Sequence, residues 1–297
     1  MSSEPLRVTD CDRRVLGGEQ IRHFEDEGFL VLPGFLDPGE IETVNRAVDR
    51  SWSDRSIYNP LTISAFTTSV AYTETYLRNV DPAARTDNYK INHLYLYDQP
   101  VRNLLLGERV QNLAATLLEG TPLLFNTLNM EWGSEQRYHF DTLYMPPPVE
   151  GRMVVLWFAL EDVRPGSGAL QYYPRSHRIQ PYRFSHGEIW ALADEMEAFD
   201  RYIGHAFAEH GLRATRFHPN AGDVFVWHAQ LYHGGAPIED RRLTRRSMVA
   251  HFWRVEDVQP ERCWEVSPGR FIMDPRSMCV AARFRSGDPE RHAPAPT

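Results

Sequence analysis

The chain has 297 residues, of which 42% are hydrophobic and 12% aromatic, and this composition supports one large folded core and excludes a disordered chain. Its 40 acidic and 32 basic residues give a formal net charge of −8, whereas proteins that bind nucleic acid or anionic membranes normally carry a basic excess. We therefore expect neither nucleic acid nor a membrane as a partner.

The sequence also indicates a cytoplasmic protein. The longest apolar run, residues 153–160, is far too short to span a bilayer, and the start MSSEPLRVTD contains no apolar signal segment. Cys11, Cys263 and Cys279 are too few and too scattered for a disulfide scaffold or a thiolate metal cluster. A reducing compartment fits this cysteine usage, and the oligomeric state is left open.

The first third of the chain is expected to be helical around one short strand. Residues 19–27 have the spacing of an amphipathic helix that ends at Gly28, and the β-like stretch FLVLPGFL (29–36) follows at once. Asp37 and Pro38 then open a second helix whose apolar residues Ile41, Val44 and Val48 share one face. Residues 51–90 show no clean period of either kind.

From Pro122 onward the chain reads as short strands separated by Gly, Pro and Asn, a pattern typical of an antiparallel sandwich or barrel. The expected strands are residues 123–132, 137–145, 152–160, 169–173, 223–228 and 246–253. An insertion at 178–216 contains a helical pattern, EIWALADEMEAFDRYI, and is a candidate lid at the barrel mouth.

These elements predict a single domain over residues 1–297. Its parts are a helical region at about 18–120, a β core at about 121–256 that carries the insertion, and a C-terminal extension at 257–297. The Pro-rich end of this extension is expected to be a loose tail.

His139 is the histidine with an aspartate two positions on, in the triplet His139-Phe140-Asp141. In a strand these two side chains point to the same face and can bind one metal ion. A rival pair, His23 and Glu25, lies in a helix, where residues two apart diverge by about 200°. Another rival, His186 with Glu188, flanks a flexible glycine. Geometry favours His139 and Asp141.

A site of two histidines and one carboxylate needs a further histidine from a distant strand and leaves three coordination positions open. His233 heads a Gly-Gly turn where it can reach the barrel mouth, and His228 lies inside a bulky apolar strand. We expect His233 to be the ligand and His228 to serve packing or to support a ligand. Taken alone, an HxD triplet arises often by chance, so the combination carries the argument.

Arg245 and Ser247 lie two apart on a β-like run and share a face. The planar guanidinium can bind a carboxylate through two hydrogen bonds, and the serine can add a hydroxyl donor. The alternative interpretation is that Arg241, Arg242, Arg245 and Arg246 form a solvated basic rim.

In this order and spacing, several motifs resemble the phytanoyl-CoA dioxygenase family of iron(II)/2-oxoglutarate oxygenases. The motifs are QIRHFEDEGFLVLPGFLDPGEI, HFD, VVLWFALEDV, PGSGALQYYPRSH, and AGDVFVWHAQLYHGG followed by RRSMVAHF. The resemblance implies a mainly β fold with flanking helices, built on a double-stranded β-helix, which is a distorted jelly-roll (cupin-like) barrel. It also implies Fe(II), 2-oxoglutarate as co-substrate and O2.

Carried over by motif, His139, Asp141 and His233 resemble the iron ligands, and Arg245 resembles the residue that binds the distal carboxylate of 2-oxoglutarate. The interval from His233 to the arginine is about one residue longer than the family pattern, so Arg246 stays a rival, while Ser247 and strand alternation favour Arg245. Trp157 and Thr127 lie on strands that usually line the co-substrate pocket, although plain core packing explains both equally well.

The resemblance implies hydroxylation of a small organic metabolite as the default reaction, with release of succinate and CO2. Asp141 occupies the carboxylate position that related halogenases leave vacant for chloride. Aromatic residues of the insertion, together with Tyr138 and Tyr144, are expected to form the substrate pocket, and secondary metabolites are among the family's substrates. The alternative functions are a non-catalytic ligand-binding barrel and a cupin-type isomerase or hydrolase that does not use 2-oxoglutarate.

Overall fold

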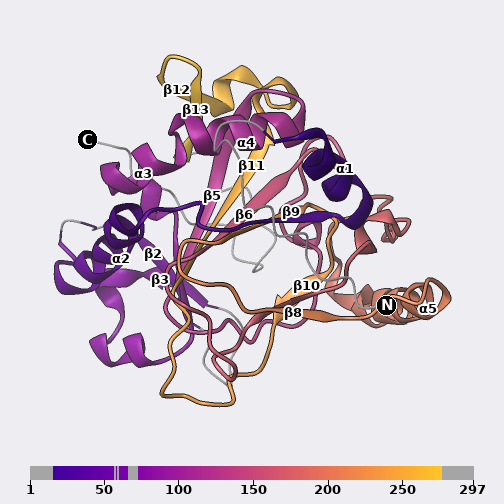
Figure 1. Cartoon of the computed structure of the whole chain (residues 1–297), viewed down its shortest axis with the longest axis horizontal. Helices are drawn as coiled ribbons and strands as arrows, with labels where there is room; N and C mark the ends of the chain where they lie inside the picture. Colours follow the sequence, from indigo (N-terminus) through magenta and orange to yellow (C-terminus); the bar gives the residue numbers. More distant parts are fainter. Residues whose placement is uncertain (1–15, 57, 59, 66–72, 276–297) are drawn as a thin grey trace.

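A computed structural model describes residues 16–56, 58, 60–65 and 73–275 of the chain (Figure 1). Cys11, Cys279 and the expected loose tail lie outside the described residues. The described strands pair into two sheets that are antiparallel except for one parallel pair, and they do not close into one ring. The mainly β class with flanking helices is confirmed, and the expected barrel takes the form of two facing sheets.

The larger sheet runs along the length of the domain. Its strands, in spatial order, are β1 (Phe29–Leu32), β9 (Val224–His228), β6 (Val154–Ala159), β11 (Ser247–Arg254), β5 (Pro122–Met130), β4 (Tyr89–Asn92), β2 (Thr62–Ala65) and β3 (Thr73–Tyr76). A hairpin of β12 (Cys263–Ser267) and β13 (Arg270–Met273) joins it, because β13 pairs in parallel with β5. The smaller sheet contains β10 (His233–Gly235), β7 (Leu170–Tyr172) and β8 (Thr215–Phe217).

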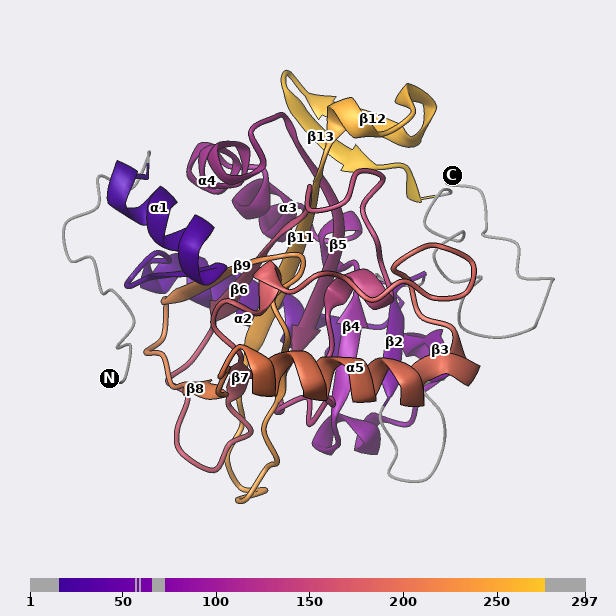
Figure 2. The same cartoon turned by 90° about the vertical axis from the view of Figure 1, so that its right-hand side faces the viewer.

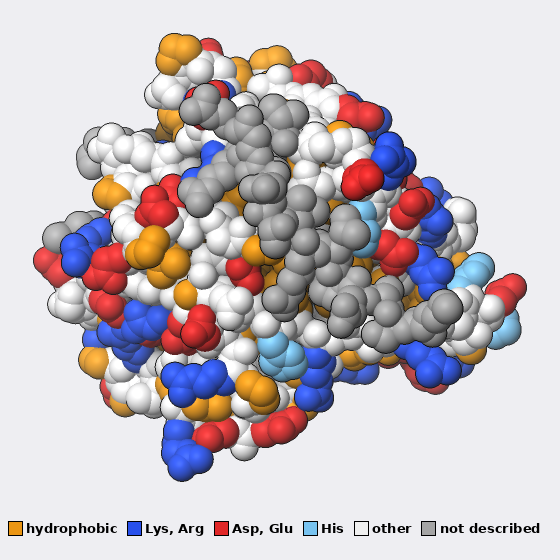
Figure 3. Space-filling model, in the orientation of Figure 1, with side chains coloured by type: hydrophobic (Ala, Val, Ile, Leu, Met, Phe, Trp, Pro, Cys, Tyr) orange, Lys and Arg blue, Asp and Glu red, His pale blue; other side chains and the backbone are white. Residues whose placement is uncertain are grey.

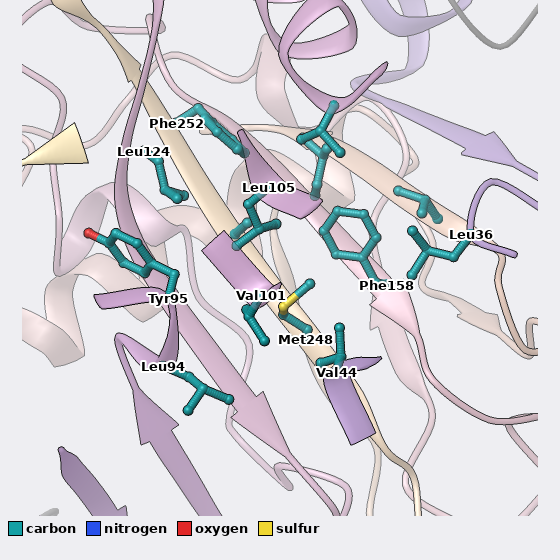
Figure 4. Packing of buried hydrophobic residues seen from close by; sticks show 14 of the residues in the cluster. Leu36, Val44, Leu94, Tyr95, Val101, Leu105, Leu124, Phe158, Met248 and Phe252 are labelled. Carbon is teal, nitrogen blue, oxygen red and sulfur yellow. The ribbon is translucent and has the colours of Figure 1, made fainter. Parts of the chain in front are cut away.

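Helices cover the outer face of the larger sheet. They are α1 (Gly18–Glu27), α2 (Pro38–Ser53), α3 (Gln99–Leu105) and α4 (Glu108–Leu118). Three residues fix the start of α2. Asp37 and Glu40 exchange side-chain-to-backbone hydrogen bonds of 2.9 Å, and Pro38 occupies the first turn. A helix-side core of apolar residues fills the space between helices and sheet, with Val44, Leu105, Phe158 and Met248 among its members (Figure 4).

Strand alternation divides β11 between two cores. Met248, Ala250 and Phe252 point into the helix-side core, whereas Val249 and Trp253 point into a second core between the two sheets. The inner face of β11 therefore carries the odd-numbered residues from 247 to 253. This face also holds the site described below.

The insertion expected at 178–216 forms a coil followed by α5 (Met196–Glu209). Its helix starts later than the sequence pattern suggested, since residues 190–192 are not helical. In Figure 1, α5 lies on the opposite side of the molecule from α2 and α3, and Figure 2 shows it crossing the domain as one continuous helix. A third apolar cluster joins α5 to Phe140 and Tyr232.

Two sequence expectations change in the structure. Residues 137–145 do not form a strand: the segment makes a single bridge at His139 and then a 3-10 turn at Asp141–Leu143. A one-residue bridge followed by a turn is too short for the periodic ladder that the prediction assumed. In contrast, residues 51–90, which showed no period, contain β2 and β3, and β2 pairs with β4 along its whole length.

Charges on the described surface shown in Figure 3 are mixed, with acidic and basic side chains interspersed. Within the described residues, no helix combines the length and the hydropathy that crossing a bilayer would demand.

Candidate metal centre and anion pocket

Three buried side chains converge at one end of the space between the sheets. Backbone hydrogen bonds join His139 and His233 in both directions, at 2.8 and 3.0 Å, so the two imidazole centroids lie 4.5 Å apart. Asp141 Oδ1 is 3.7 Å from His139 Nε2 and 3.8 Å from His233 Nε2. One possible ligand atom from each residue lies within 4.8 Å of those of the other two, so the three could hold one metal ion.

The orientation of the two imidazole rings suits a metal. His139 Nδ1 is 2.8 Å from the carbonyl of Arg137 and His233 Nδ1 is 2.9 Å from that of Leu231. A carbonyl only accepts, so each Nδ1 carries a proton, and Nε2 is the ring nitrogen that each histidine turns toward Asp141. Burial lowers the pKa of His233 to about 4, against the opposite effect of Asp141. Burial alone would raise the pKa of Asp141, but the imidazoles of His233 and His139 hold it well below its ordinary value.

The other oxygen of Asp141 is held by a tryptophan that sequence reasoning did not identify. Trp227 Nε1 donates a hydrogen bond of 2.8 Å to Asp141 Oδ2, and the Trp227 ring lies 4.7 Å from the His233 ring. No local pattern links these residues, because the contact depends on how β9 meets the turn after His139. A third imidazole, that of His251, has its Nε2 3.9 Å from Asp141 Oδ1, and His251 is 1% exposed. His251 could have been found by extending the alternation of Arg245 and Ser247 along the strand.

Arg245 is the second notable feature of the site. Its side chain is among the largest fully buried ones, its guanidinium lies 5.4 Å over the Trp157 ring, and Nη2 is 3.8 Å from Met130 Sδ. Nε has no hydrogen-bond partner, and no carboxylate of the described residues forms an ion pair with the guanidinium. Burial lowers the pKa of Arg245 to about 10. An unpaired buried cation of this kind is costly unless an anion joins it.

Arg246, the alternative to Arg245, forms ion pairs outside the site. Its Nη2 lies 2.6 Å from Glu131 and 3.2 Å from Asp49, on the helix side of the sheet. The structure therefore separates the two arginines: Arg245 faces the interior without a carboxylate, and Arg246 belongs to an ion-pair network. Ser247 is fully buried, pairs across the sheet with Met130, and its hydroxyl has no partner.

Trp157 lies beside Arg245, as expected of a pocket residue, but the structure does not bring Thr127 to the site. Thr127 pairs with Ala250, whose side chain belongs to the helix-side core. The cause is a β-bulge in β5 opposite the step from His251 to Phe252, where the extra residue Phe125 shifts the alternation by one. The expected place of Thr127 in the co-substrate pocket is therefore wrong.

A second buried cation adjoins the metal centre, and sequence reasoning missed it because it lies in the region without a period. Lys90 of β4 is 5% exposed, and its ammonium donates to Gln136 Oε1 at 2.5 Å. Gln136 Nε2 lies in turn 3.3 Å from His139 Nε2. This chain of contacts makes one wall of the site polar.

The two tyrosines expected at the substrate pocket lie in different surroundings. Tyr144 is 42% exposed with its ring 5.5 Å from that of His139, so it borders the metal centre. Tyr138 stacks on Tyr232 at 5.6 Å within the α5 cluster, and burial raises its pKa to about 12.

The remaining histidine candidates lie away from the three ligands. His228 packs against His177, with ring centroids 5.4 Å apart, which agrees with the expected packing role. His23 packs on Phe29, and His186 stacks at 3.8 Å on Trp190. None of these three belongs to a group with metal-binding geometry in the described part of the chain.

Comparison with known proteins places this geometry in context. The family model described as phytanoyl-CoA dioxygenase (PhyH) matches residues 24–247. Phytanoyl-CoA dioxygenase domain-containing protein 1 of Bos taurus is 27% identical over a match that covers 54% of this chain and 66% of the relative, and its counterpart in Danio rerio is 24% identical with 55% and 66% covered. The match thus spans slightly less than two thirds of these curated relatives.

Solved structures of similar fold include the non-heme alpha-ketoglutarate-dependent carbocyclase SnoK from nogalamycin biosynthesis, with a TM-score of 0.62, 14% identity, and 91% of this chain and all of that chain covered. The epimerase SnoN in complex with Fe3+, alpha-ketoglutarate and nogalamycin RO gives a TM-score of 0.62 at 19% identity, with 94% of each chain covered. EctD from S. alaskensis with 2-oxoglutarate and 5-hydroxyectoine gives 0.58 at 16% identity, with 86% and 82% covered. At these identities the likeness concerns the fold.

Proposed function

The chain belongs to the phytanoyl-CoA dioxygenase family, and we propose that it is an iron(II)- and 2-oxoglutarate-dependent oxygenase acting on a small organic metabolite. One observation carries the proposal. Two histidines and an aspartate, all buried, face one point, and a fully buried arginine without a carboxylate partner lies in the same interior. A metal alone would leave that arginine without a role.

The donor set fits ferrous iron. His139, His233 and Asp141 offer two imidazole nitrogens and one carboxylate oxygen, the arrangement of non-haem iron oxygenases with three positions left open. These residues would hold the ion, and the iron together with 2-oxoglutarate would supply the oxidising power for O2 activation.

The pocket fits a dicarboxylate. Arg245 and Ser247 have buried polar atoms without partners, and a carboxylate would satisfy both through charge-assisted hydrogen bonds. Trp157 supports the guanidinium from one side. The ammonium of Lys90, which donates to Gln136 beside His139, adds positive charge to one wall of the site and so favours an anion over a neutral ligand.

The protein's own part in the reaction is to orient these groups and to exclude water. His139, Asp141 and His233 are at most 6% exposed, so solvent reaches the centre poorly. We propose residues 178–216 as the lid, because their cluster packs on Phe140 and Tyr232, the neighbours of two ligands, and because Ala191 N donates to Leu143 O at 3.0 Å.

We propose hydroxylation of an unactivated C–H bond as the reaction, with release of succinate and CO2. We also propose that residues 1–297 form a single domain. Asp141 supports hydroxylation, since it occupies the position that a halide would need. Tyr144, exposed beside His139, is the proposed contact for an organic substrate of moderate size.

Anaerobic titration with Fe(II) and then 2-oxoglutarate tests the proposal before any substrate is known. The expected result is the weak visible charge-transfer band of chelated 2-oxoglutarate, with one equivalent bound. A protein that binds Fe(II) but shows no band and no affinity for 2-oxoglutarate would instead be a metal-binding barrel of another function.

A further inference from the structure

Trp227 contacts two of the three proposed metal ligands. The residue is 2% exposed, its indole N–H donates to Asp141 Oδ2 at 2.8 Å, and its ring lies 4.7 Å from that of His233. We propose that Trp227 is a positioning residue that restricts Asp141 to coordination through Oδ1 alone. This inference rests on the proposed function, because it concerns the same metal centre.

The two oxygens of Asp141 have different surroundings. Oδ1 lies within 3.8 Å of Nε2 of both His139 and His233, whereas Oδ2 accepts the indole hydrogen bond. A carboxylate that turned toward a metal with both oxygens would occupy one more coordination position. A chelating co-substrate and O2 together need all three positions that the two-histidine, one-carboxylate set leaves open. Holding Oδ2 away preserves them.

An indole is well suited to this task. It donates one hydrogen bond and cannot accept one, and it does not ionise, so it cannot bind the metal itself or change with pH. The bond to an ionised carboxylate in a buried site belongs to the strong, charge-assisted kind.

The surrounding structure explains why the restraint comes from Trp227. Asp141 begins a 3-10 turn and has no strand ladder to fix its direction. Trp227, by contrast, is paired on both sides, with Phe29 of β1 and Val155 of β6, and its ring also packs on Phe225. A rigid strand therefore orients a ligand from an irregular segment.

Trp253 provides a matched control for the alternative that Trp227 only fills the core. Trp253 is also buried, lies in the same apolar cluster, and stacks on Phe125 at 4.1 Å. Its Nε1 has no hydrogen-bond partner. Replacing either tryptophan with phenylalanine removes the same atoms, but only Trp227→Phe removes a bond to Asp141.

The experiment compares wild type, Trp227→Phe and Trp253→Phe in the full chain under anaerobic conditions. We expect both variants to bind Fe(II) within about tenfold of wild type and to lose thermal stability, Trp227→Phe more than Trp253→Phe because it also leaves Asp141 Oδ2 without its donor. Only Trp227→Phe should raise the dissociation constant for 2-oxoglutarate, by about tenfold or more, and shift the chelate band. Substitution with Co(II) gives a second readout, because its visible bands weaken when the coordination number rises.

Amide and indole NMR of the metal-free protein gives a third readout that needs no ligand. The Trp227 indole proton should resonate downfield, and the shift should disappear in Asp141→Ala but not in Trp253→Phe. Equal 2-oxoglutarate affinity and equal Co(II) spectra in wild type and Trp227→Phe would overturn the positioning role and leave the proposed function intact. A wild-type protein that binds neither Fe(II) nor 2-oxoglutarate would overturn both.

Discussion

Arg245 offers the sharpest test of the site, because the structure predicts opposite effects on stability and on binding. Burial moves its pKa from 12.5 to about 10. At 1.36 kcal/mol for each unit of pKa, keeping the guanidinium charged in the ligand-free interior costs about 3 kcal/mol. This figure is an upper limit, because the contacts of the guanidinium with Trp157 and Met130 offset part of the cost. Arg245→Met keeps most of the side-chain volume and removes the charge. The ligand-free protein should therefore become more stable, by about 1 to 3 kcal/mol.

Binding should change in the other direction. Removing one partner of a desolvated, hydrogen-bonded charge pair typically costs about 2 to 5 kcal/mol, so Arg245→Met should weaken 2-oxoglutarate binding by roughly one to three orders of magnitude. Fe(II) binding should survive. The assays are urea unfolding of the metal-free protein and anaerobic 2-oxoglutarate titration of the iron-loaded one.

Arg246→Met is the matched control on the neighbouring residue. Arg246 pairs with Glu131, whose side chain is 6% exposed and retains Arg85 as a partner. The variant should therefore lose about 1 to 3 kcal/mol of stability and bind 2-oxoglutarate normally. If Arg246→Met loses the co-substrate while Arg245→Met binds it and unfolds more easily, the face assignment of β11 is wrong.

Three further outcomes follow from the same geometry. His233→Ala should abolish Fe(II) binding while the far-UV spectrum is retained, as measured by anaerobic titration; undiminished affinity would remove His233 from the ligand set. Burial lowers the pKa of His228 to about 4, so between pH 6.5 and pH 4 the unfolded chain binds a proton that the folded protein does not. The free energy of unfolding should therefore fall as the pH drops below 6.5, by about 1 to 2 kcal/mol at pH 5 relative to pH 7. Urea unfolding at both pH values should show a flatter dependence in His228→Asn than in wild type, and parallel losses in the two proteins would contradict the assignment. Thr127→Val should raise stability by about 1 kcal/mol, since it removes a buried hydroxyl without a partner, and should leave 2-oxoglutarate affinity unchanged; weaker binding would return Thr127 to the site face of β5.

Local sequence patterns were enough to predict helices α1 and α2 and the strands β1, β5, β6, β7, β9 and β11. Asp37 and Glu40 form their reciprocal cap within four residues, and the apolar runs that became β6, β9 and β11 are contiguous in the chain. The HxD triplet and the later histidine likewise identified three side chains that the structure brings together, although His139 and Asp141 meet through a bridge and a turn and not through a strand.

Register decided what the local patterns left open. Alternation alone would put Thr127 on the inner face with Leu123 and Phe125, and the bulge in β5 reverses it. The choice between Arg245 and Arg246 depends on carboxylates more than eighty residues away in sequence, Glu131 and Asp49, which only the folded chain brings to Arg246.

Local sequence patterns also failed to identify three residues of the site, Trp227, His251 and Lys90. Each reaches the site through a tertiary contact: Trp227 with Asp141, His251 beside the same carboxylate, and Lys90 through Gln136. A side-chain period is a property of a few consecutive residues, whereas the direction of a ligand and the charge of a pocket depend on segments that meet only when the sheets pack. The sequence by itself therefore determined which residues have metal-binding chemistry, and the tertiary structure decided which groups orient them and which cation stays free for an anion.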